Sequence, residues 1–170
     1  MMTYIKKSND RAGFTLIEVI IYLALFGILF VGAVSGAYSI METSGKNQAQ
    51  SMIQEEGGFL LAKINRMVSN GKGAAISDDL KSLTVTAWGD PGATSTIGID
   101  TTGKNMIYAA GDGDPVLLNS GNVTVSGLVF HNKFVSGEPG GVEYMFTLTA
   151  NAPNGMSTKM PFSSTSYFRK

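Results

Sequence analysis

An apolar stretch near the amino terminus constrains this chain more than any other feature. Residues 19 to 41 read VIIYLALFGILFVGAVSGAYSIM and contain no ionisable side chain other than tyrosine. As a helix rising about 1.5 Å per residue, the stretch would span roughly 30 Å, the thickness of a bilayer's hydrocarbon core. Gly27, Gly32 and Gly36 would weaken a helix in water, but membrane helices tolerate glycine, which lets neighbouring helices approach closely. The stretch therefore predicts a membrane-spanning helix.

The charges around this stretch predict its orientation. Lys6, Lys7 and Arg11 lie upstream of it and are opposed only by Asp10. Because basic residues are enriched on the cytoplasmic flank of a membrane helix, we expect the amino end inside and the rest of the chain outside. The whole chain has 13 basic and 13 acidic residues, so its net charge does not indicate a nucleic-acid partner. Cysteine is absent, which excludes thiolate metal sites, a cysteine nucleophile and disulfides.

Glu18 is an ionisable residue at the start of the apolar run, where a charge is costly unless it has a partner. Taken alone, it could be a carboxylate that reaches the headgroups from the end of an ordinary signal anchor. A cleaved signal peptide would instead need a small-residue site after the apolar run, for which AVSGAYS is a weak candidate. The residues before Glu18 favour a third interpretation.

Residues 12 to 19 read AGFTLIEV, which resembles the processing site of type IV prepilins and type II secretion pseudopilins. The resemblance implies that a membrane prepilin peptidase cuts after Gly13 on the cytoplasmic side and that Phe14 is then N-methylated. It also implies that the Glu18 carboxylate pairs with the Phe14 α-amino group of a neighbouring subunit. A buried carboxylate and a buried ammonium are each costly alone, so their pairing would set the register between subunits.

The resemblance also implies partners and a location. The partners would be other pilin or pseudopilin subunits, the prepilin peptidase, a membrane assembly platform and, before assembly, membrane lipid. We expect a single-pass cytoplasmic-membrane protein, N-in and C-out, that enters a cell-surface or periplasmic filament. Its function would be that of a structural subunit serving a pilus, protein secretion or DNA uptake. A minor subunit is favoured, because the carboxy-terminal pattern resembles minor pilins and the disulfide of many major pilins is missing.

An alternative from another class remains open at this point. The apolar run could tether an exported binding domain that never polymerises. The two hypotheses differ in what they predict for the amino terminus, since only a filament subunit requires cleavage after Gly13.

Beyond the apolar run the sequence becomes amphipathic. Apolar residues recur at helical spacing from Ala49 to Val68, so the helix is expected to continue to about Asn70. Gly71 is suited to a left-handed cap after that end. Gly57-Gly58 is the weak point, where the helix could kink or melt, because each glycine costs about 1 kcal/mol relative to alanine. We expect the apolar stripe to pack beneath the chain's own sheet; a coiled-coil partner face is the alternative.

From residue 80 onward, short apolar alternations between glycine-rich turns predict strands. The expected strands cover residues 83–88, 96–99, 105–108, 116–118, 123–134, 142–150 and 157–168. The connections are too short for crossover helices, so we expect an antiparallel sheet and an α+β fold. The expected organisation is a cytoplasmic leader (1–13), a transmembrane and polymerisation helix (14–41), its amphipathic continuation (42–70) and an exported β-rich domain (71–170).

Two segments of the β-rich region suggest ligands, and both suggestions are weak. Gly98 to Lys104 has the glycine and lysine spacing of a phosphate-binding loop. However, Asn105 replaces the residue that would hold magnesium, and a strand follows where that motif requires a helix, so we expect a hairpin turn at residues 102–105. Asp112 and Asp114 lie on a glycine-rich loop of the kind that calcium favours, but no EF-hand pattern surrounds them.

Catalysis is not expected from this sequence, and neither is a cofactor other than that weak calcium candidate. His131 is the only histidine, and we expect it on the outward face of a strand. No Gly-x-Ser-x-Gly elbow is present. Trp88 and Tyr108 have two interpretations, a ligand-binding surface or aromatic packing inside the sheet, of which packing is the more common.

Overall fold

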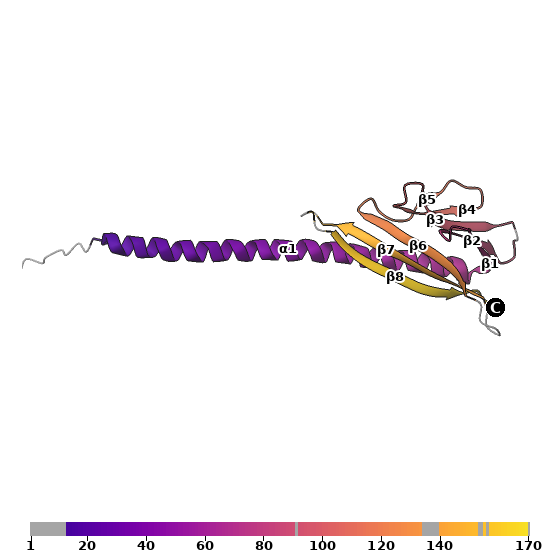
Figure 1. Cartoon of the computed structure of the whole chain (residues 1–170), viewed down its shortest axis with the longest axis horizontal. Coiled ribbons are helices and arrows are strands. Elements are labelled where there is room, and N and C mark those ends of the chain that lie inside the picture. Colours follow the sequence, from indigo (N-terminus) through magenta and orange to yellow (C-terminus); the bar gives the residue numbers. More distant parts are fainter. Residues whose placement is uncertain (1–12, 91, 134–139, 153–154, 156, 170) are drawn as a thin grey trace, which may run out of the picture. The chain divides into compact units, whose positions relative to one another are not determined.

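The computed structural model describes residues 13–90, 92–133, 140–152, 155 and 157–169 (Figure 1). The chain divides into two compact units, one ending at Glu42 and the other beginning at Thr43. A single helix, α1 (Leu16–Ser69), contributes residues to both units. All strands of the described chain belong to the second unit.

Helix α1 begins with a side-chain cap. Thr15 precedes its first residue, and the Thr15 Oγ1 accepts the backbone N–H of Glu18 at 3.4 Å. The Thr15 carbonyl accepts the same N–H at 3.1 Å and that of Val19 at 3.3 Å. Capping of this kind satisfies N–H groups that the first turn leaves without helical partners. The helix therefore begins at Leu16, two residues after Phe14.

The predicted end of α1 is confirmed to within a residue, whereas the predicted cap is wrong. Gly71 does not adopt a positive φ; it is the first residue of strand β1 and pairs with Ala87. A Cβ at Gly71 would lie 2.2 Å from Cγ1 of Val85. Glycine is therefore needed here because a neighbouring strand approaches closely, and not because the backbone is left-handed.

The strands form two antiparallel sheets. The first sheet has the order β1 (Gly71–Ile76), β2 (Ser82–Ala87), β3 (Thr94–Ile99), β4 (Met106–Ala110) and β5 (Val116–Leu117). The second has the order β6 (Val123–Lys133), β7 (Gly141–Asn151) and β8 (Ser157–Tyr167). The predicted α+β class and antiparallel pairing are confirmed. The expectation of one sheet is wrong, and β1 was not predicted.

A buried side chain lies where the two sheets separate. Asn119 follows β5, and its Oδ1 accepts the N–H of Met106 at 2.8 Å. Its Nδ2 donates to the carbonyl of Val123, the first residue of β6, at 2.6 Å. The side chain thus binds backbone groups of β4 and β6 that a continuous ladder would otherwise pair. Asn119 therefore connects the start of β4 in the first sheet to the start of β6 in the second.

The hydrophobic core forms between the second part of α1 and both sheets. The buried helix residues are Ala49, Ile53, Gly57, Leu60, Ile64 and Val68. Buried residues of the strands include Leu83, Val85, Ile97, Met106, Val125, Phe130, Val142, Tyr144, Phe146 and Leu148. Strands β6, β7 and β8 lie along this part of the helix (Figure 1). The amphipathic stripe therefore packs against the chain's own sheets, as predicted.

Helix α1 continues without interruption through Gly57-Gly58, so the expected kink or melting does not occur. A Cβ at Gly57 would lie 2.2 Å from Cζ of Phe162. The Phe162 ring in turn stacks on Phe146, with a centroid separation of 5.5 Å. Gly57 is thus the gap in the helix surface that admits an aromatic ring from β8, and this packing offsets the low helix propensity of glycine.

Candidate assembly site at the start of the helix

The first part of α1 exposes its apolar side chains in all directions. Every large apolar side chain between Leu16 and Met41 is at least 38 % exposed, and Leu16 reaches 82 %. In the part of the chain that the structure describes, α1 is the one helix long and apolar enough to cross a membrane. Exposed apolar surface on this scale is typical of a segment that is covered by lipid or by other proteins.

The predicted processing residues lie directly before this helix. Gly13 and Phe14 are exposed, and the Phe14 side chain is 76 % exposed. Apart from its chain neighbours, no described residue lies within 4 Å of the position that a Cβ on Gly13 would occupy. The leader predicted upstream, residues 1–12, lies outside the described residues.

Glu18 is the one charged residue between Leu16 and Met41, and the structure supplies it with a neutral partner. The Tyr22 hydroxyl donates a hydrogen bond to Oε1 of Glu18 at 3.2 Å. Among the described residues, no basic side chain forms an ion pair with this carboxylate. Sequence reasoning missed Tyr22, although its position four residues after Glu18 was a sufficient signal, because such residues are neighbours on a helix.

Residues 8–34 match the family profile described as the prokaryotic N-terminal methylation motif. The amino-terminal segment therefore has the signature of type IV pilins and pseudopilins. The matched residues include Gly13, Phe14 and Glu18, together with most of the exposed part of α1. No curated protein and no solved structure matches the chain.

The methylation motif and the apolar helix together indicate an exported, membrane-anchored protein with a structural role. The motif implies other pilin subunits and the prepilin peptidase as partners. The resemblance stated from the sequence is confirmed by this match. Cleavage after Gly13, methylation of Phe14 and pairing through Glu18 stay predictions.

The segment that resembles a phosphate-binding loop is a hairpin turn between β3 and β4, as predicted. Gly103 has a φ of +72°, and the residues after the turn form strand β4 instead of a helix. The Asp100 carboxylate accepts hydrogen bonds from Thr102 Oγ1 at 2.6 Å, Asn105 Nδ2 at 2.8 Å and the Lys104 backbone N–H at 3.0 Å. These hydrogen bonds, that of Thr102 foremost, hold the pKa of Asp100 well below its usual range.

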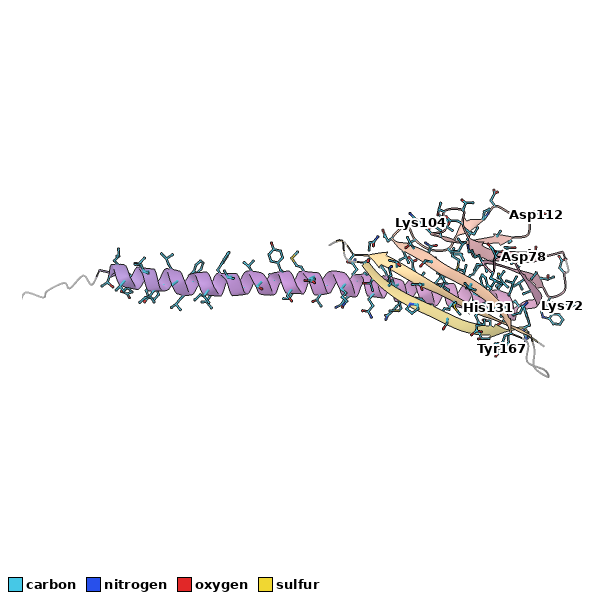
Figure 2. The ribbon with its side chains drawn as sticks, in the orientation of Figure 1. Lys72, Asp78, Lys104, Asp112, His131 and Tyr167 are labelled. Carbon is cyan, nitrogen blue, oxygen red and sulfur yellow. The ribbon has the colours of Figure 1, made fainter. Side chains whose placement is uncertain are left out.

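The weak calcium candidates lie on the connection between β4 and β5. Asp112 and Asp114 are both exposed, and Figure 2 shows Asp112 at the edge of the β-rich region. Among the described residues, no group of three or more histidine, aspartate or glutamate side chains is arranged to hold a metal. Calcium binding at this pair stays a prediction. His131 is exposed on β6, opposite Glu143 of β7, as predicted for an outward strand position.

Trp88 and Tyr108 have different surroundings. Tyr108 is half-buried and lines a cavity of about 190 Å³, in which Lys63 Nζ lies 3.9 Å from the centre of its ring. Trp88 is 55 % exposed and lines another hollow with Asn70 and Arg169, so the expectation that it packs inside the sheet is wrong. It follows the last residue of β2, outside the strand. Neither hollow contains both rings.

Proposed function

We propose that this chain is a minor structural subunit of a type IV pilus or of a type II secretion-like pseudopilus. In this proposal it is cut after Gly13, methylated at Phe14 and assembled into a filament through α1. The observation that carries the proposal is Glu18, a lone carboxylate in an exposed apolar helix, four residues after the proposed new amino terminus.

The charge at Glu18 supplies a mechanism for selecting neighbours. Cleavage after Gly13 would create an ammonium group on Phe14, next to the capped start of α1. Within the apolar environment of a membrane or of packed helices, a carboxylate and an ammonium are each poorly solvated and attract one another strongly. The pair would form between subunits and would fix their axial stagger. The exposed apolar side chains around it would be covered first by lipid and then by other subunits.

The remaining parts of the proposal follow from the sequence. Lys6, Lys7 and Arg11 favour an N-in, C-out orientation, which places residues 71–170 outside the cytoplasm. Residues 1–13 would be the leader, and residues 14–41 would leave the bilayer by the action of a membrane assembly platform. The missing cysteines and the loose carboxy-terminal resemblance support a minor subunit over a major one.

Mass spectrometry of the mature amino terminus tests the processing step. The expected result is N-methylphenylalanine at residue 14. An intact leader, or a chain cut near Ser35, would contradict the proposal and favour the tethered binding domain that does not polymerise. Quantitative mass spectrometry of purified filaments tests the minor role, for which the chain should be far less abundant than the principal subunit.

Glu18→Ala tests assembly directly. We expect the fraction of chain recovered in sheared filaments to fall by about tenfold or more, since breaking a buried ion pair is strongly unfavourable. Glu42→Ala is the matched control, because Glu42 is an exposed acid on the same helix just beyond the apolar run. Equal incorporation of Glu18→Ala and the unmodified chain would refute the proposed role of the carboxylate.

A further inference from the structure

Tyr22 interrupts the apolar stretch with a polar group, and that group lies against Glu18. Its ring is 55 % exposed, so it does not fill a core. Its hydroxyl donates to Glu18 Oε1 at 3.2 Å, whereas no hydrogen bond within the described residues engages Oε2. One carboxylate oxygen thus has a donor within the helix, and the other has none among the described residues.

The order of the two residues along the helix makes this contact possible. Side chains on an α-helix tilt toward its amino end, so a tyrosine four residues after an acid reaches back to it. Tyr38 and Glu42 have the same spacing in the opposite order, and no hydrogen bond joins them in the described part of the chain. The chain therefore contains its own control pair on the same helix.

We propose that Tyr22 is a positioning residue for Glu18, an inference that rests on the proposed assembly role of that carboxylate. Before assembly, the Tyr22 hydroxyl donates the hydrogen bond that the carboxylate would otherwise lack in an apolar environment. This contact holds the Glu18 side chain along the helix surface and leaves Oε2 facing outward. When the Phe14 ammonium of a neighbouring subunit arrives, it binds a carboxylate that is already oriented, so less side-chain freedom is lost on pairing.

Tyr22→Phe removes the hydroxyl and keeps the ring. With leader cleavage and membrane level measured in the same cells, we expect the filament fraction of the full chain to fall by about threefold to tenfold, the effect of losing one typical intramolecular hydrogen bond. Tyr38→Phe should leave that fraction unchanged. A Tyr22→Phe chain that enters filaments as well as the unmodified chain would overturn the inference, and so would an equal loss in Tyr38→Phe.

An infrared measurement separates positioning from a general structural role. In the full processed chain, reconstituted in vesicles with ¹³C-labelled glutamate, the carboxylate band that disappears in Glu18→Gln belongs to Glu18. Tyr22→Phe should shift that band, because a hydrogen-bond donor is lost, and Tyr38→Phe should not. An unshifted band in Tyr22→Phe would show that the hydroxyl does not engage Glu18, and the inference would fail.

The two proposals fail in distinguishable ways. If Glu18→Ala enters filaments normally, the assembly role of Glu18 is refuted, whatever Tyr22→Phe does. If Glu18→Ala is excluded while Tyr22→Phe matches the unmodified chain, the assembly role stands and only the positioning role is lost.

Discussion

Two parts of one helix differ in what covers their apolar side chains. Between Leu16 and Met41 every large apolar residue is exposed to some extent, whereas between Ala49 and Val68 a single stripe is buried to 1 % exposure or less. The stripe between Ala49 and Val68 packs against the two sheets of the same chain. The apolar residues between Leu16 and Met41 have no such partner surface within their own unit of the described structure. Apolar sequence therefore predicts burial, but it does not say which molecule provides the cover.

The glycines of the helix repeat the same contrast. At Gly27, Gly32 and Gly36 an added Cβ would have no described atom within 4 Å beyond the adjacent backbone of the helix itself. At Gly57 it would meet the Phe162 ring at 2.2 Å. A glycine that looks like a weakness in the sequence is thus a packing requirement in the second part of the helix. In the first part, it is open surface that another helix can approach.

Truncating a leucine in each part of the helix should give the largest difference in unfolding free energy between the two parts. Leu60 is 0 % exposed and Leu29 is 72 % exposed. In detergent micelles, Leu60→Ala should lower the free energy of unfolding of the β-rich unit by about 2–5 kcal/mol, because it leaves a cavity. Leu29→Ala should change it by less than about 0.5 kcal/mol. Chemical unfolding followed by tryptophan fluorescence and circular dichroism measures both, and similar losses would contradict the contrast.

Adjacent glycines provide the next test. Gly57→Ala should destabilise the β-rich unit by about 1–3 kcal/mol, because its methyl group overlaps the Phe162 ring. Gly58→Ala should stabilise it by up to about 1 kcal/mol, because nothing lies within 4 Å of its Cβ and alanine favours the helix. The cost of Gly57→Ala should shrink in a Phe162→Ala background. Thermal unfolding of the four variants tests this pattern, and stabilisation by Gly57→Ala would refute the assigned contact.

Acid should act on a hairpin of the β-rich unit with a smaller and local effect. Because hydrogen bonds lower the pKa of Asp100 in the folded chain, its stabilising contribution is complete above the unfolded value of about 3.9. The contribution is lost as the pH falls below that value and through the lower folded pKa. Amide hydrogen exchange at Lys104 and Asn105, whose backbone N–H groups donate to Asp100, should accelerate relative to other strands. Asp100→Asn should remove this pH dependence, and its persistence in that variant would assign it to another group.

The smallest effect is expected at a glycine of the exposed part. Gly32→Ala should change the unfolding free energy of the β-rich unit by less than about 0.5 kcal/mol, since its Cβ would contact no other element of the described chain. Any effect of this substitution should instead be seen when helices associate, in cross-linking yields between copies in a membrane. A large change in unfolding would show that the first part of α1 has a packing partner within the chain.

Local sequence was sufficient to predict much of this molecule. The apolar run and the residues from Gly13 to Glu18 predicted the membrane helix and the pilin resemblance, because side-chain composition and a short contiguous motif are local properties. The hairpin after Asp100 followed from turn chemistry in the same way. The end of the helix was placed correctly, but the left-handed cap expected at Gly71 does not form. Strand β1 was missed because its sequence, GKGAAI, has little β propensity, and it is a strand because β2 pairs with it.

By itself, the sequence determined the exposed helix, its methylation motif and the alternation of the strands, since each is written in adjacent or periodically spaced residues. Only the tertiary structure decided that the strands form two sheets, that Gly57 admits Phe162 and that Asn119 is buried. These features depend on residues far apart in the chain, and their free energy arises only when the elements meet. The contact between Tyr22 and Glu18 lies between these cases: its spacing is local, but the direction of side chains on the folded helix decides that it forms.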